Sequence, residues 1–153
     1  MHIISALAQF AHVLAAIVWI GGLFFAYMAL RPAAAALDVP KRLALWARTF
    51  ARFFPWVFVA IGLLYISGTV LIFYSRGLAG NYHIHAMIGL AVVMTLLFLH
   101  VYFVPYRRLR QKVTTEDWEG ASKDLAQIRF LVGLNLIIGL SLVAVATVGS
   151  KLS

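Results

Sequence analysis

Four long apolar stretches dominate the chain, and its charged residues are confined to the segments between them. The first stretch, residues 3–30, contains no Lys, Arg, Asp or Glu. Three further stretches, at about residues 53–74, 85–104 and 130–150, are equally free of charge. About 20 apolar residues suffice for a helix to cross a bilayer. The pattern therefore predicts an all-α fold, an integral membrane four-helix bundle that forms a single domain over residues 1–153.

The ends of these helices are predicted from prolines and capping residues. Arg31–Pro32 should end the first span and Pro105 the third, because proline lacks the backbone N–H that continues a helix. Thr114–Thr115 ahead of Glu116–Asp117 is typical of an N-cap with acidic residues in the first turn. We expect a helix there that can run on into the fourth span.

The distribution of basic residues predicts how the bundle is oriented. Of the 13 Lys and Arg residues, all but Arg76 and Lys151 lie in residues 31–52 and 107–129. Positive charge collects in cytoplasmic loops. We therefore expect both termini on the outer side, which in a bacterium is the periplasm, in a multi-pass protein of the inner membrane. Membrane lipid explains the net charge of +8, and no nucleic-acid partner is expected.

Composition narrows the chemistry that the bundle can support. The chain is 63% hydrophobic and only 12% charged, whereas a soluble domain has about 25% charged residues. It has no cysteine, which excludes disulfides, iron–sulfur clusters and thiolate metal sites. His and Met remain as the ligands for soft or borderline metals.

His12 is the main candidate for a functional residue. It lies well inside the first span, where an ionisable group is costly and usually faces the bundle interior. Ser5, Gln9, His12 and Trp19 share one face of that helix by their spacing. Two imidazoles on different helices are the usual protein ligands of a b-type haem. His85 is the preferred second ligand. His100 is the alternative, although its depth in the membrane differs from that of His12 by about 10 Å.

Other polar residues suggest a metal site or a structural role. His83 and His85, with His2 near the N-terminus, could hold copper or zinc at the outer surface, or could simply be solvated. Asn135 should form a hydrogen bond across the bundle, and could instead approach a cofactor. Trp46, Trp56 and Tyr82 are expected to be interface anchors, and Arg52 and Arg129 are expected to reach lipid headgroups.

The residues of the first helix also resemble a known family. His12, Trp19 and the pair Gly21–Gly22 resemble the first helix of CopD-type copper-resistance membrane proteins and of the related HemJ-like protoporphyrinogen oxidases. Tyr82-His83-Ile84-His85 occupies the place of a histidine-x-lysine element in the HemJ-like group, and His100, Arg129 and Asn135 also resemble residues of that group. The resemblance implies haem b with His12 and His85 as ligands. Leu30-Arg31-Pro32 and Leu136 depart from the HemJ-like pattern, which argues against porphyrinogen oxidation.

Three functions are compatible with these residues. The leading hypothesis is a haem b-binding membrane redox protein, an oxidoreductase or electron carrier working with a quinone or porphyrin-like partner. The alternative is copper transport or copper binding at the outer side through His2, His83, His85 and His12. The third is an accessory subunit that packs into a homo-oligomer or a larger membrane complex without a cofactor.

Overall fold

The structure is a computed structural model that describes the backbone of residues 2–74 and 82–152 and the side chains of residues 3–74 and 82–149. Every element in it is helical. They are α1 (His2–Phe25), the π-helical turn η1 (Ala26–Leu30), α2 (Arg31–Ala34), α3 (Val39–Tyr74), α4 (Tyr82–Val101), the π-helical turn η2 (Tyr102–Tyr106), α5 (Arg107–Thr114) and α6 (Trp118–Leu152).

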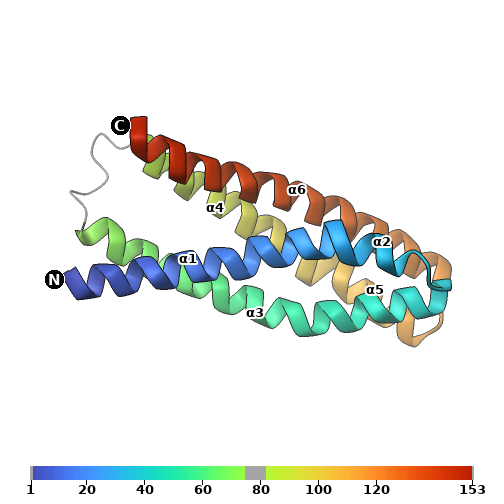
Figure 1. Ribbon diagram of the computed structural model, residues 1–153. Coiled ribbons are helices and arrows are strands. Elements are labelled where there is room, and N and C mark those ends of the chain that lie inside the picture. Colours follow the sequence, from blue (N-terminus) through green and yellow to red (C-terminus); the bar gives the residue numbers. More distant parts are fainter. Residues whose placement is uncertain (1, 75–81, 153) are drawn as a thin grey trace.

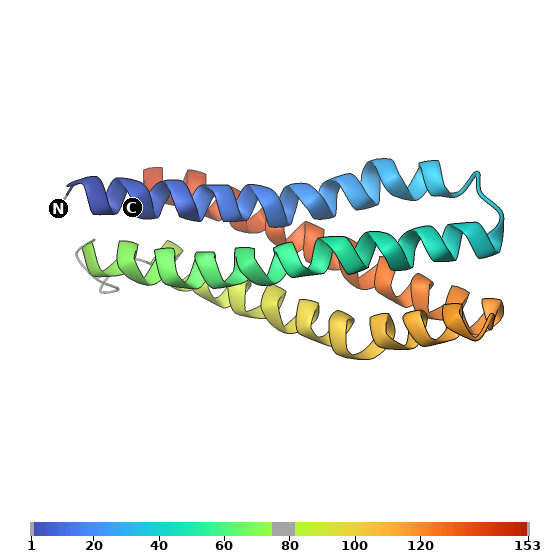
Figure 2. The same ribbon diagram turned by 90° about the horizontal axis from the view of Figure 1, so that it is seen from below.

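These elements form four long helical runs that lie side by side (Figures 1 and 2). The runs are α1–η1–α2, α3, α4–η2–α5 and α6. α1 begins and α6 ends at the same end of the bundle, which we call the terminal end (Figure 1). The turns from α2 to α3 and from α5 to α6 lie at the opposite end, which we call the basic end. The prediction of an all-α bundle with four long apolar helices is confirmed.

The surface of the bundle has the character of a protein that sits in lipid. Each of the four runs is long and apolar enough to cross a membrane: Ile3–Ala34, Val39–Tyr74, Tyr82–Thr114 and Trp118–Gly149. Only 17–22% of the residues in their most apolar windows are buried within the protein. Apolar side chains such as Phe10, Ile66 and Phe130 are more than 60% exposed. Such a surface requires hydrocarbon around it, so the chain is a multi-pass membrane protein.

Two prolines that were predicted to end helices are accompanied by π-helical turns, and the helices continue past them. The helix continues through Pro32 to Ala34, and through Pro105 to Thr114, so both predicted stops are wrong. Pro105 lies within a π-helical turn, and Pro32 lies two residues after the end of one. A proline removes one backbone hydrogen bond and displaces the carbonyl four residues earlier, which an extra residue in the turn relieves.

The turn between α5 and α6 differs from its predicted form. Asp117, not Thr114 or Thr115, caps α6, because its Oδ1 accepts a hydrogen bond from the backbone N–H of Gly120 at 3.0 Å. The Thr114 and Thr115 hydroxyls bond back to carbonyls of α5. Glu116 takes a left-handed conformation (φ 59°) that reverses the chain. α6 then runs without a break through the fourth span, as the sequence allowed.

The buried core is concentrated toward the basic end. An aromatic cluster joins α3 to the α4–η2 run: Phe50 stacks on Phe54 with ring centroids 5.0 Å apart, and Phe54 meets Tyr106 edge-on at 4.8 Å and Phe98 at 5.3 Å. Beyond Ala60, the described part of α3 buries only Ser67. The two helix pairs α1–α3 and α4–α6 are therefore held tightly at one end and lie further apart at the other (Figure 1).

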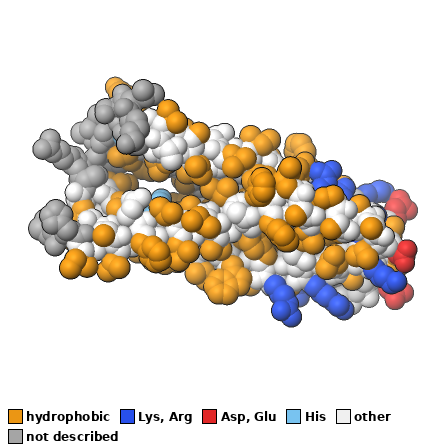
Figure 3. All heavy atoms as spheres, in the orientation of Figure 1, with side chains coloured by type: hydrophobic (Ala, Val, Ile, Leu, Met, Phe, Trp, Pro, Cys, Tyr) orange, Lys and Arg blue, Asp and Glu red, His pale blue; other side chains and the backbone are white. Residues whose placement is uncertain are grey.

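The charged side chains collect at the basic end. Lys and Arg residues, together with the acidic residues, surround that end in the space-filling view, while the visible flanks are largely apolar (Figure 3). The same view shows the surface hollowed between the two helix pairs toward the terminal end, where a histidine side chain is visible. The charge separation along the bundle agrees with the sequence, and the side on which each end lies stays a prediction.

Candidate functional site

His12 is tied to the second long helix by a hydrogen bond inside the bundle. Its Nδ1 lies 2.9 Å from the hydroxyl oxygen of Ser67 on α3. The imidazole is half-buried, and Ser67 is only 4% exposed. The face of α1 that carries His12 therefore turns toward α3, as the polar seam of that helix predicted.

The hydrogen bonds of Ser67 fix which nitrogen of His12 carries the proton. A serine hydroxyl has a single hydrogen. Ser67 donates that hydrogen to the carbonyl of Leu63, the residue one turn earlier on α3. Its oxygen must then accept from His12, so Nδ1 is the protonated nitrogen. Nε2 consequently carries a lone pair.

The lone pair on Nε2 is the chemically available feature of this site. The hydrogen bond to Ser67 uses Nδ1, and the backbone of Leu64 is a second hydrogen-bond partner of the ring. A histidine that ligates a metal commonly uses one ring nitrogen for the metal and donates from the other to a protein oxygen. His12 and Ser67 have that arrangement.

Gly68 contributes the space that the imidazole occupies. A Cβ atom added at Gly68 would lie 3.4 Å from Cε1 of His12, which is a tight contact. Ser67 and Gly68 together thus provide one hydrogen-bond acceptor and one gap for the ring. Sequence reasoning missed both residues, although a small polar pair in the middle of an apolar span was a visible signal.

The other predicted ligands lie elsewhere in the bundle. α1 packs along α3 while α4 packs along α6, so His12 and His85 belong to different helix pairs. His83 is half-buried, and a Cβ at Gly149 of α6 would meet its Cβ at 2.9 Å. His85 and His100 are exposed. The side chain of His2 lies outside the described residues.

No complete metal site is assembled in the part of the chain that the structure describes. Over those residues, no three His, Asp or Glu side chains lie close enough together to hold one ion. The metal-binding role predicted for His12 therefore stays a prediction. The roles predicted for His2, His83, His85 and His100 stay predictions.

Trp19 and Asn135 occupy the bundle interior. Trp19 is 2% exposed and meets Phe98 of α4 edge-on at 6.2 Å. Asn135 donates from Nδ2 to the carbonyl of Met94 at 3.3 Å, which confirms the predicted hydrogen bond across the bundle. Both residues keep one polar atom without a partner among the described residues, Nε1 of Trp19 and Oδ1 of Asn135.

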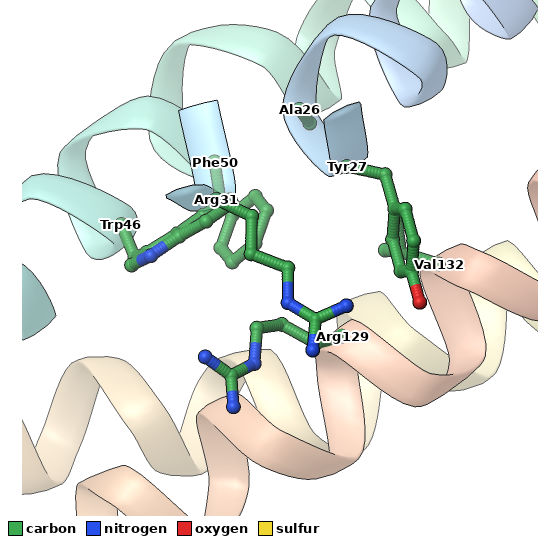
Figure 4. A pocket seen from close by; sticks show the side chains of 7 residues that line it. All are labelled: Ala26, Tyr27, Arg31, Trp46, Phe50, Arg129 and Val132. Carbon is green, nitrogen blue, oxygen red and sulfur yellow. The ribbon is translucent and has the colours of Figure 1, made fainter. Parts of the chain in front are cut away.

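One residue at the basic end differs from its predicted role. Trp46 was expected to anchor the protein at the membrane interface, but its side chain is 2% exposed and packs on Phe50. Arg129 is half-buried and lines a small pocket with Arg31 (Figure 4), and its contact with lipid headgroups stays a prediction. Trp56 is 64% exposed, as expected of an interface anchor.

Comparison with known proteins identifies one similarity. Residues 47–149 match the family model of copper resistance protein D (CopD). The match includes Ser67 and Gly68 of α3, the histidines of α4 and the apolar part of α6. It leaves out α1, and with it His12 and Trp19. Comparisons with curated proteins and with solved structures gave no match.

Proposed function

This chain belongs to the copper resistance protein D family, and we propose from that premise that it binds copper within the membrane as part of copper transport or copper resistance. His12 is the proposed central ligand. The single observation that supports it is the hydrogen bond between Nδ1 of His12 and the hydroxyl of Ser67, which leaves Nε2 as the ring nitrogen that would bind the metal.

The chemistry of the site suits copper. Imidazole nitrogen is a good ligand for copper ions, and thioether sulfur is added when the ion is Cu(I). The hydroxyl of Ser67 orients the ring and keeps Nδ1 protonated, so the ring does not have to lose a proton when the metal binds. An imidazole buried in a bilayer without such a use would be a costly residue to place there.

Copper would approach from the terminal end. His12 lies roughly 15 Å along α1 from the start of the helix. His83 and His85 begin α4 at the same end, and Met87 is half-buried one turn further on. His2 is placed by the sequence near the mouth of this route. These residues are the proposed first contacts of the ion, and His12 is the deeper one.

The proposed orientation follows from the charges of the two ends. Because the basic end carries nearly all Lys and Arg residues, we place it in the cytoplasm and the terminal end on the outer side. Copper would then meet the protein from the periplasm of a bacterial inner membrane.

Copper content of the purified protein tests the proposal. After loading with Cu(I) and removal of unbound metal, wild type should retain stoichiometric copper and His12→Ala should lose most of it. Ser141→Ala changes an exposed polar residue of α6 that has no proposed part in the site and measures the general effect of a substitution. Absence of copper from the wild-type protein would overturn the proposal.

Haem b is the second candidate, and the unpartnered polar atoms of Trp19 and Asn135 favour it. His12 fits one axial position through Nε2. The other proposed ligand, His85, lies on α4 in the other helix pair. A bound haem would supply a reversible one-electron carrier, which a membrane quinone could reduce. A Soret band that is lost in His12→Ala would favour haem over copper.

A further inference from the structure

The outward face of α4 combines apolar residues with two exposed histidines. His85, Gly89, Val92, Leu96 and His100 recur at intervals of three or four residues, and all of them are exposed. Such intervals place them in one stripe along the helix, which we call the α4 stripe. The buried residues of α4 lie on its other faces, where the helix packs against α6.

His100 is the member of the α4 stripe that lies well inside an apolar stretch. It precedes Arg107, the first charged residue after it, by seven positions, or roughly 10 Å of helix. Long Lys and Arg side chains can extend to the membrane surface from such a depth, but the imidazole has no flexible stem. A neutral imidazole that faces hydrocarbon leaves one donor and one acceptor without a partner, which is costly.

The described part of the chain supplies no partner for this ring. The side chain of His100 forms no hydrogen bond, ion pair or ring contact with the side chains or backbone of residues 3–74 and 82–149. His12 differs, since it is half-buried and bonded to Ser67. Lipid tails offer no polar group at the depth of His100. A polar partner there has to belong to another protein surface in the membrane.

The rest of the α4 stripe suits close contact with a second helix. Nothing lies within 4 Å of a Cβ atom placed at Gly89, and Leu96 is 60% exposed. Apolar residues that alternate at three- and four-residue intervals form the seam along which two nearly parallel helices pack. A small residue in such a seam lets two membrane helices approach closely.

We propose that the α4 stripe is the interface of a homodimer, in which His100 forms a hydrogen bond with His100 of a second copy. Copies inserted with the same orientation are related by a two-fold axis along the membrane normal, so the same residue of each copy lies at the same depth. A neutral imidazole has one N–H donor and one lone pair. The ring is therefore complementary to its own copy, which carries the missing donor and acceptor at that depth.

Cross-linking in the membrane tests the interface, and the chain has no cysteine to interfere. Leu96→Cys places a thiol in the α4 stripe. Ile137→Cys is the matched control on α6, because Ile137 is 64% exposed against 60% for Leu96. A bifunctional methanethiosulfonate reagent should convert most of the Leu96→Cys protein into a species of twice the chain's mass, and little of the Ile137→Cys protein.

Variants of His100 test the hydrogen bond itself. Energy transfer between fluorescently labelled copies in liposomes, measured at increasing lipid-to-protein ratio, gives the dimerisation constant. His100→Leu should weaken dimerisation roughly 3- to 30-fold, the usual range for a polar contact between membrane helices. His100→Asn should retain most of it, because an amide side chain also carries both a donor and an acceptor. Both changes lie on an exposed face and leave the buried core as it is.

Four results would overturn the proposal. One is Leu96→Cys protein that stays monomeric in the membrane. Another is cross-linking of Ile137→Cys to the same extent, which would mean random collision. The third is a cross-linked product whose mass shows a different protein. The fourth is a dimerisation constant that is the same in wild type and His100→Leu, which would show that the imidazole contributes nothing to the contact.

Discussion

Ser67, which is not one of the proposed metal ligands, determines that Nδ1 of His12 carries the proton. Ser67 lies on α3 and holds His12 of α1 by one hydrogen bond, while its own hydrogen goes to the carbonyl of Leu63. In the proposed copper site, metal binding by the imidazole would thus depend on the hydroxyl of Ser67. A substitution there tests the site without removing the proposed ligand.

Ser67→Ala should weaken copper binding by about 10–100-fold, which is the usual cost of losing the group that orients a metal-ligating histidine. Competition with a Cu(I) chelator measures the change. Ser141→Ala is the matched control, because Ser141 also bonds to the carbonyl one turn earlier, that of Ile137, but is exposed and bonds to no histidine. Equal copper affinity of the two variants would exclude the role assigned to Ser67.

At the scale of helical elements, close contacts between neighbouring runs keep the bundle together. Gly22 of α1 lies directly against the ring of Phe53 on α3, and Gly133 of α6 lies against the ring of Tyr27, 2.8 Å from where its Cβ would be. Gly21 differs, since nothing lies within 4 Å of a Cβ placed there. Small residues that let helices approach are typical of membrane bundles.

Gly22→Ala should destabilise the folded protein by about 1–3 kcal/mol, since Phe53 has to move from its packed position. Gly21→Ala should be neutral or slightly stabilising, because alanine is the better helix former and meets no neighbour. Unfolding in mixed micelles with increasing dodecyl sulfate measures both. A loss of stability in Gly21→Ala equal to that in Gly22→Ala would contradict the packing described here.

The attachment of α5 to α6 depends on one buried carboxylate. Asp124→Asn should cost about 1–3 kcal/mol of folding free energy, less than the loss of a fully buried partner because Arg108 and Lys112 still reach water. Glu119→Gln removes an exposed pair with Lys123 and should cost under about 1 kcal/mol. The same unfolding assay compares them, and an inverted order would show that Asp124 contributes little.

At the scale of the whole molecule, the separation of charge along the bundle predicts its orientation. The chain has no cysteine, so single cysteines can be introduced without background. Asp38→Cys and Glu116→Cys, in the two turns of the basic end, should resist a membrane-impermeant thiol reagent in intact cells and react after lysis. Lys151→Cys near the C-terminus should react in intact cells. The reverse pattern would place the basic end outside and require copper to enter from the cytoplasm.

The sequence predicts the bundle well because charge is absent from four stretches, and this pattern depends little on tertiary detail. It does not predict how each helix is rotated about its axis. Trp46 lies at membrane-interface depth by position, yet its side chain is buried, since neighbouring residues cover it. His12 was identified because an ionisable group in hydrocarbon is exceptional, whereas its partner Ser67 depended on the packing of α1 against α3.

The nitrogen spectrum of His12 is the most direct test of the account. Protein labelled with ¹⁵N in histidine is recorded with and without diamagnetic Cu(I), and the signals that vanish in His12→Ala identify the residue. We predict a neutral ring with the proton on Nδ1, and a shift confined to Nε2 when Cu(I) binds. A proton on Nε2 before copper is added, or an Nε2 signal that Cu(I) leaves unchanged, would contradict the central claim.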